Sequence, residues 1–308
     1  MNFFSSAIRI FIWFLFPLHL YAQQVIDSAF QLPDIIPAYK NAEGPLMLVD
    51  LHHNNQSVRE GNYNPFFTLL EKDGYRIRFL EKDFSEKTLN QGRILVIINA
   101  LSKENIDNWA LPVYPAFSIK EAETVYEWVI NGGSLLLVAD HMPFPAAAEL
   151  LAKKIGAFFT NGFAIDTIHW DPLVFKRSDH TLKNHPVIFG RNDAERIDSV
   201  ATFWGQAFQT DEKKLQGLFS FSDNVISYNP DTAWRFREHT PVVPVKNWLQ
   251  AAAGEFGKGR VIILGEAGML TAQLVGPSRT RMGINSKKGK QNTQFILNVM
   301  RWLFFLYP

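Results

Sequence analysis

Four apolar runs in this 308-residue sequence are each followed by side chains that can bind a ligand or move a proton. The residues concerned are Asp50, His52, His53 and Asn54 after the first run, Asn99 after the second, Asp140 and His141 after the third, and Glu266 after the fourth. Carboxylates beside an imidazole can bind a divalent cation or act as acid and base. If the chain is an enzyme, Asp140, His141 and Glu266 are the catalytic candidates.

The runs themselves predict how these side chains are positioned. Leu46–Asp50, Ile94–Asn99, Ser134–Val138 and Arg260–Leu264 are apolar on both faces, which is typical of central parallel strands. Ligands bind outside the carboxyl ends of the strands in open α/β sheets. With a flavodoxin-like strand order, the four strand ends would meet at one rim, where we expect a ligand site.

Helical patterns separate these strands. Residues 65–74 have apolar positions at helical spacing and end in glycine, and Ser118 with Glu121 predicts a capped helix over 119–131. A further helix is expected over 146–155. Alternating strands and helices predict an α/β fold with a doubly wound, mostly parallel sheet.

The pattern changes over residues 157–247, where aromatic residues, turns and short alternating runs predict a strand- and loop-rich elaboration. Residues 248–264 then predict a hairpin with its turn at 257–259, and 292–306 a final helix. We expect residues 46–308 to form a single domain that includes the elaboration.

Spacing alone does not decide which histidine faces the predicted site. Side chains alternate along a strand, so Asp50 and His52 would face one way and His53 the other, unless the chain turns at once. Asp140 and His141 diverge in the same manner unless the strand has ended. Met142-Pro143 indicates that it has.

The first 22 residues have the pattern of a secretory signal peptide. Arg9 precedes an apolar run, and Ala22 is a small residue at the expected cleavage point. The alternative is a membrane anchor, but the run is shorter than the roughly 20 residues that a span needs. We expect a periplasmic or otherwise exported protein without a stable membrane span after cleavage, in which residues 23–45 form an exposed lead-in.

Charge and cysteine content exclude several classes of function. Cleavage would remove Arg9, so that the 31 basic residues become 30 and match the 30 acidic ones. A near-neutral chain gives no electrostatic reason to bind nucleic acid. With no cysteine, the chain has no thiol nucleophile, no disulfide and no cysteine-ligated metal. The cofactor stays open, and a divalent metal on carboxylates and imidazoles is one choice.

Other motifs point to no reaction class. The sequence has no dinucleotide-binding glycine motif after a strand, no Walker loop, no H-E-x-x-H and no G-x-S-x-G elbow. Among its eight tryptophans, Trp170, Trp204 and Trp234 are candidates for stacking on a sugar. Core packing is the expected role of most of the other aromatic residues.

Several stretches, in this order along the chain, resemble a known family. They are Asp50–Asn54, Asn131–Phe144, Asn161–Ala164, His185–Gly190, Gly205–Phe208, Phe256–Val261, Gly265–Gln273 and Gln291–Trp302. Together they resemble an exported bacterial family with a class I glutamine amidotransferase-like, or flavodoxin-like, domain. The wider superfamily includes trehalose-utilisation-type domains and domains associated with gliding and intraflagellar transport.

The resemblance implies a fold and the location of a site, over most of residues 46–306. It adds Gln206 and Gln273 to the ligand-binding candidates. Amidotransferases use a cysteine nucleophile with a His–Glu pair, and this chain has no cysteine, so that chemistry does not carry over. Fold alone does not decide function.

Two functional hypotheses follow. The first is an exported ligand-binding or accessory protein with a polar site at the carboxyl edge of the sheet, whose partners are carbohydrate or cell-envelope components. The second is a metal-dependent or acid–base hydrolase that acts on the same kind of material. The missing nucleophile and the lack of a reaction motif favour the first.

Overall fold

The computed structural model describes residues 24–169 and 172–307. The predicted signal peptide and Trp170 therefore lie outside the described residues. In the part of the chain that is described, no helix is both long enough and apolar enough to cross a membrane.

Five parallel strands form the centre of the main sheet. They are β2 (Leu46–Asp50), β3 (Arg76–Leu80), β4 (Ile94–Ile98), β5 (Ser134–Val138) and β15 (Gly259–Leu264). Their order, β3-β2-β4-β5-β15, is the flavodoxin-like order expected from the sequence. Residues in β4, β5 and β15 are buried throughout, as the continuous apolar runs require.

The main sheet is mixed. The expectation of a mostly parallel sheet holds for the five central strands and is wrong for the strands beyond β15, which are antiparallel. The hairpin predicted over 248–264 is present and reverses the chain, so β14 lies antiparallel beside β15. The strands beyond it are also antiparallel. These four strands are β14 (Leu249–Phe256), β10 (Phe208–Thr210), β6 (Ala157–Phe159) and β11 (Gln216–Ser220). Three of them come from the 157–247 elaboration, which therefore extends the main sheet.

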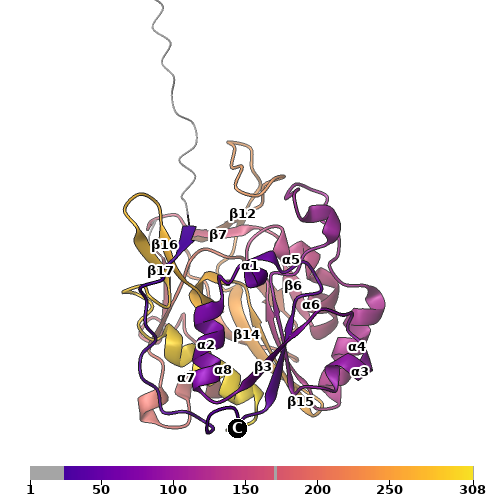
Figure 1. The fold of residues 1–308 in the computed structure, drawn as a ribbon. Helices are drawn as coiled ribbons and strands as arrows, with labels where there is room; N and C mark the ends of the chain where they lie inside the picture. Colours follow the sequence, from indigo (N-terminus) through magenta and orange to yellow (C-terminus); the bar gives the residue numbers. More distant parts are fainter. Residues whose placement is uncertain (1–23, 170–171, 308) are drawn as a thin grey trace, which may run out of the picture.

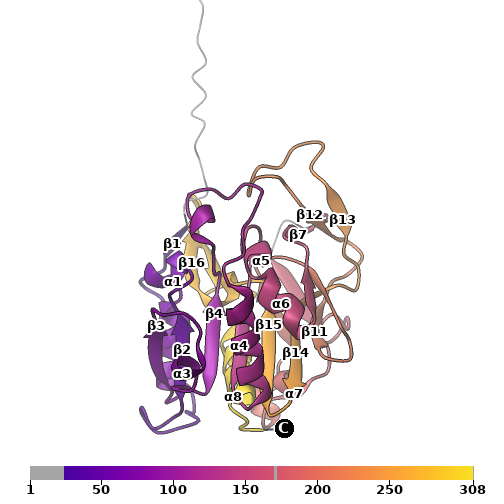
Figure 2. The same ribbon diagram turned by 90° about the vertical axis from the view of Figure 1, so that its right-hand side faces the viewer.

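Helices cover both faces of the sheet (Figures 1 and 2). One face carries α2 (Asn64–Lys72) and α8 (Asn292–Leu303), and the other carries α3 (Glu86–Leu89), α4 (Ile119–Ile130) and α6 (Glu149–Ile155). Alternate strand residues enter the two cores: Met47 and Val49 pack with α2 and α8, whereas Leu48 packs on the opposite face.

Local signals determine where the helices begin and end. Ser118 and Glu121 form the predicted capping box of α4. The helix predicted over 146–155 is divided into α5 (Phe144–Ala147) and α6, and α6 ends at Gly156, whose φ is +88°. Smaller helical segments are α1 (Gln56–Arg59), α7 (Pro186–Phe189), η1 (Lys103–Asn105), η2 (Asp193–Glu195) and η3 (Gly268–Leu270).

Three small sheets complete the fold. They contain β1 (Gln24–Ile26), β16 (Ala272–Val275) and β17 (Thr280–Gly283); β7 (Phe163–Asp166), β12 (Val225–Tyr228) and β13 (Val242–Pro244); and β8 (Leu173–Lys176) and β9 (Ser199–Thr202). The expected lead-in is not simply an exposed tail, because β1 pairs with β16 and Phe30 and Tyr39 pack against the core. The first two sheets lie near the carboxyl edge (Figure 1).

Candidate functional site

A pocket of about 600 Å³ opens at the carboxyl edge of the sheet. It brings together some of the side chains that the sequence predicts for a site. The predicted residues that line it are Asn99, Asp140, His141, Glu266 and Gln273. They come from the ends of β4, β5 and β15 and from β16, as parallel strands with a common carboxyl edge require.

Asp140 and Glu266 form the acidic part of this pocket. Asp140 is partly exposed, and Glu266 is completely buried. Burial raises the pKa of Glu266 well above its usual value, and the charge of Asp140 raises it further. Burial also raises the pKa of Asp140, although the neighbouring His141 partly opposes this rise. The two carboxyl groups interact electrostatically, and like charges disfavour the state in which both are ionised.

His141 presents a free nitrogen beside these acids. Its Nδ1 lies 2.8 Å from the carbonyl oxygen of Met142. A carbonyl oxygen only accepts hydrogen bonds, so Nδ1 carries the proton and, in the neutral ring, Nε2 is left as an acceptor. The ring stacks on Phe163 at 4.6 Å between centroids and meets Trp234 edge-on at 4.5 Å.

Asn99 connects the ends of β4 and β5. Its Oδ1 accepts a hydrogen bond from the backbone of Asp140 at 3.0 Å, and its Nδ2 donates to the hydroxyl of Tyr63 at 3.2 Å. The backbone of Asn99 has φ of +50°, a conformation that asparagine tolerates better than most residues. Asn99 thus holds Asp140 in place. Burial, Asp140 and Glu266 together raise the pKa of Tyr63, which keeps its hydroxyl neutral.

Aromatic side chains from two loops line the same pocket as the acids. Trp109 and Trp234 line the pocket and lie 6.4 and 4.5 Å from the His141 ring, centroid to centroid. The loops that carry them rise above the sheet (Figure 2) and are tied by two backbone hydrogen bonds, from Leu111 to Asp231 and from Ala233 to Trp109. Trp204 packs on Trp234 at 5.6 Å. Of the two sugar-stacking candidates in the described residues, Trp234 lines the pocket and Trp204 does not.

The pocket contains acceptors without donors. Glu266 Oε1 and Gln273 Oε1 are buried and have no hydrogen-bond partner among the described residues. No lysine or arginine of residues 24–169 or 172–307 lines the pocket. Buried polar groups are normally paired, so these atoms indicate that a donor-bearing ligand or water belongs here.

A second acid–histidine group lies outside this pocket. His53 Nδ1 is 3.0 Å from Asp50 Oδ1, and its Nε2 is 3.1 Å from Glu121 Oε1. Burial lowers the pKa of His53, but the hydrogen bond and charge of Asp50 and the charge of Glu121 outweigh it and raise this pKa overall. Since the chain turns directly after β2, His53 rather than His52 faces Asp50.

The remaining predicted residues also lie elsewhere. His52 points to the surface and contacts Asp83 at 2.9 Å. Asn54 Nδ2 donates to the carbonyl of Leu101, and Gln206 Nε2 donates to the carbonyl of Ala139. Neither side chain lines the pocket. Their hydrogen bonds connect loops to the sheet, which is a structural role.

Several lining residues were not predicted from the sequence. Tyr63, Trp109 and Phe203 lie far from the four apolar runs and enter the pocket only because loops fold over its edge. For Trp109, the loop composition of residues 102–117 gave no signal of chemistry. Gln24 of β1 also lines the pocket, although the lead-in was expected to be exposed.

The arrangement does not suit a tightly held metal. Within the described ranges, no three side chains of the His, Cys, Asp and Glu types converge as metal ligands. Asp140, Glu266 and His141 line the same pocket, and the hydrogen bond from His141 Nδ1 to the carbonyl of Met142 leaves Nε2 as the ring atom that could coordinate a ligand.

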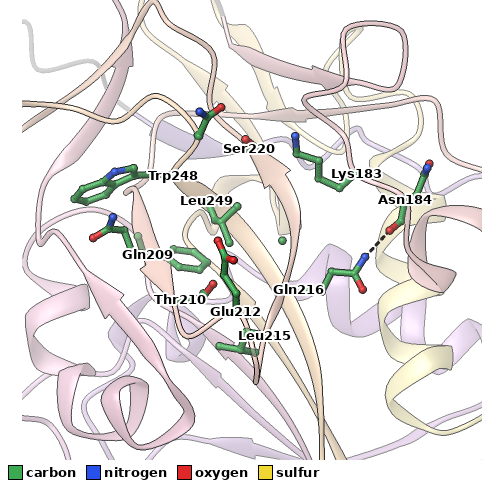
Figure 3. Close-up of a pocket in the computed structure, with 13 residues that line it drawn as sticks. Lys183, Asn184, Gln209, Thr210, Glu212, Leu215, Gln216, Ser220, Trp248 and Leu249 are labelled. Carbon is green, nitrogen blue, oxygen red and sulfur yellow. Dashed lines mark hydrogen bonds between the residues drawn. The ribbon is translucent and has the colours of Figure 1, made fainter.

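Another hollow, of about 760 Å³, lies at the antiparallel side of the sheet (Figure 3). Its side chains include Lys183, Glu212 and Trp248, and Gln216 donates to the backbone of Asn184 at 2.7 Å. Neither of its charged side chains is fully buried. This hollow lacks the buried acids that distinguish the carboxyl-edge pocket.

Comparison with solved structures defines the class of fold. The N-terminal domain of mmIFT52 aligns with a TM-score of 0.59 and 11% identity, over 83% of this chain and 96% of that domain. The chain therefore has the α/β fold of that domain. At this identity the similarity concerns the fold alone.

Two bacterial proteins align more loosely. A ThuA-like protein from Bacteroides uniformis has a TM-score of 0.46 and 14% identity, over 85% of this chain and 93% of its own. A cytoplasmic protein from Salmonella typhimurium has a TM-score of 0.47 and 14% identity, over 84% and 98%. No protein-family model matches the sequence, and a search of curated proteins found no relative.

Proposed function

We propose that this chain is an exported, amidotransferase-like domain that binds a small carbohydrate or a related cell-envelope component in the carboxyl-edge pocket. The signal-peptide pattern supports export, and the flavodoxin-like order of β3-β2-β4-β5-β15 supports the amidotransferase-like class. One observation carries the binding proposal: a partly exposed acid, Asp140, and two indoles, Trp109 and Trp234, line the same pocket of about 600 Å³. Pockets of this size commonly hold small ligands.

Sugars match this combination of surfaces. A sugar ring has an apolar C–H face, which packs on an indole, and hydroxyl groups, which donate to carboxylate and amide oxygens. Trp109 and Trp234 supply the flat surfaces, and Asp140 supplies the acceptor. The three side chains come from separate loops and strand ends, so the ligand would touch groups that only the folded chain brings together.

Binding can be tested on the purified mature chain with a panel of monosaccharides and disaccharides, including N-acetylglucosamine and cellobiose. We expect at least one sugar to raise the unfolding temperature saturably, and Trp234→Ala and Asp140→Asn to lower its affinity about tenfold or more. The control is His52→Ala, which changes a surface histidine outside the pocket. A sugar that binds all three variants equally well would show that the pocket is not its site.

Acid–base hydrolysis is the second candidate, and a specific observation favours it. Asp140 and Glu266 both have raised pKa values, and His141 offers Nε2 as a base. A carboxyl group that stays protonated near neutral pH can act as a general acid while a second group acts as the base. No side-chain nucleophile is needed, because water itself can attack as the nucleophile.

Hydrolysis can be measured with p-nitrophenyl glycosides and esters. We expect a bell-shaped dependence of kcat/KM on pH, with activity lost in Asp140→Asn and in His141→Ala. Activity that survives both changes would exclude this mechanism. Binding without turnover, weakened by Trp234→Ala, would leave the binding function alone.

A further inference from the structure

We propose that the ligand of the carboxyl-edge pocket carries a protonated amine, so that its ammonium group lies against Asp140 between Trp109 and Trp234. An amino sugar with a free amine is the matching class of carbohydrate. This inference rests on the proposed binding function and makes the ligand class more specific.

The charges of the side chains that line the pocket favour a cationic ligand. Asp140 and Glu266 both line it, and none of the lysines and arginines in the described ranges does so. Backbone amides stabilise part of this negative charge: Asp140 Oδ1 accepts from the backbone of His141 at 2.8 Å and Glu266 Oε2 from that of Met269 at 2.9 Å. The amides of Ala267, Gly268 and Phe203 also lower the pKa values of the two acids, but burial outweighs them. Burial favours the neutral forms of these acids, and a cation bound between them would favour their charged forms instead. The titratable groups that face this pair are His141 and Tyr63.

The acceptors in the pocket match an ammonium group better than a hydroxyl-rich ligand alone. An ammonium offers three donors and no acceptor. Asp140 can receive one of these donors directly, because it is the exposed member of the acid pair. Glu266 Oε1 and Gln273 Oε1, which lack donors, lie in the pocket wall, where they make its field more negative and leave no site for an anion.

The aromatic walls act in the same direction. The face of an indole attracts a cation within about 6 Å of the ring centroid, and more strongly where water is excluded. Trp109 and Trp234 come from the two tied loops and both lie near the ring of His141. An ammonium over Asp140 would therefore meet both a carboxylate and an aromatic face.

Matched ligand pairs test this inference by isothermal titration calorimetry at about pH 6. Glucosamine is compared with glucose and N-acetylglucosamine, which share its ring and lack its charge. Choline is compared with 3,3-dimethyl-1-butanol, its neutral isostere. We expect glucosamine to bind at least tenfold more tightly than either neutral sugar. A preference for choline over its isostere, in addition to the preference for glucosamine, would show that the pocket recognises the positive charge as well as the N–H donors.

Two variants locate the effect. Asp140→Asn should remove most of the preference for the charged ligand, whereas Asp83→Asn, which removes an exposed carboxylate outside the pocket, should keep it. Glu266→Gln should weaken the preference less, because Glu266 acts from within the wall. The unfolding temperature of each variant shows whether it is folded before its binding is compared.

Proton release gives an independent readout. Entry of a cation favours ionisation of Asp140 and Glu266, so the wild type should release protons on binding glucosamine, measured as heats that differ between buffers of different ionisation enthalpy. Glu266→Gln should reduce that release. Equal binding of glucosamine and glucose, or tighter binding of neutral sugars, would overturn the cation while leaving the carbohydrate function in place. Failure of all five ligands to bind would overturn the cation, and the wider sugar panel would then decide the function.

Discussion

The two acid–histidine groups at the carboxyl ends of the strands contain the same residue types and differ in how their polar atoms are satisfied. His53 uses both ring nitrogens, one on Asp50 and one on Glu121, and Asp50 is completely buried. In the pocket, His141 bonds only the carbonyl of Met142 through its ring, and Glu266 Oε1 has no partner among the described residues.

This difference separates a structural group from a candidate site. A buried imidazole held by two carboxylates connects β2 to the start of α4 and leaves no group free to meet a ligand. Unpaired acceptors beside a pocket cost stability, and such costs are typical of functional sites. Changes to the first group should therefore affect folding, and changes to the second should affect binding.

The largest expected change in stability results from substitution of His53. In His53→Ala, Asp50 and Glu121 lose the imidazole that hydrogen-bonds both of them, so we expect the free energy of unfolding to fall by about 3–5 kcal/mol. Urea denaturation measures it. The binding of pocket ligands by the folded fraction should be unchanged. A loss below about 1 kcal/mol would mean that His53 does not form a structural connection.

Glu266→Gln should change the free energy of unfolding in the opposite direction, by stabilising the protein. An isosteric amide removes a buried carboxyl group next to Asp140, so we expect the protein to gain about 1 kcal/mol at neutral pH while ligand affinity falls. Thermal unfolding and calorimetry measure the two properties. Reduced stability together with intact binding would reverse the assignment of the two groups.

The stability contributed by Glu266 and by His53 should change with pH in different pH ranges. The pKa of Glu266 in the folded protein is raised above its unfolded value of 4.5. The contribution of Glu266 to the free energy of unfolding is therefore fully present below about pH 4.5 and is lost as the pH rises through the folded pKa. The difference between the wild type and Glu266→Gln should grow upward from that pH.

The pKa of His53 is also raised, from a usual value of 6.5. The contribution of His53 to the free energy of unfolding is therefore fully present below about pH 6.5 and is lost as the pH rises through the folded pKa. The destabilisation caused by His53→Ala should accordingly be largest near pH 6 and shrink toward pH 9. Urea denaturation of both variants over pH 4–9 measures the two windows. Identical pH profiles for the two variants would contradict the comparison.

The smallest expected effect is on His52. Its side chain is 40% exposed and its partner Asp83 is 80% exposed, and exposed ion pairs contribute about 0–1 kcal/mol. We expect His52→Ala to change the free energy of unfolding by about 0.5 kcal/mol or less and to leave binding unchanged. A larger loss would show that the neighbouring histidines form one unit.

Local sequence patterns were enough to predict much of the fold. Continuous apolar runs predicted the buried central strands, and Ser118 with Glu121 predicted the start of α4, because burial and capping depend on residues close in sequence. The same patterns did not show that Glu121 also bonds His53, since that contact spans 68 positions. The antiparallel half of the sheet was underestimated because its strands are short and their partners distant.

The sequence by itself determined the types of residue at the strand ends, the absence of thiol chemistry and the common edge where Asn99, Asp140 and Glu266 meet. Only the tertiary structure decided which acids have partners. The turn after β2 directs His53 back to Asp50, whereas two loops bring Trp109 and Trp234 to the pocket that Asp140 lines. Satisfaction of a buried charge depends on groups that approach from elsewhere in the chain, so residue type and spacing alone do not determine it.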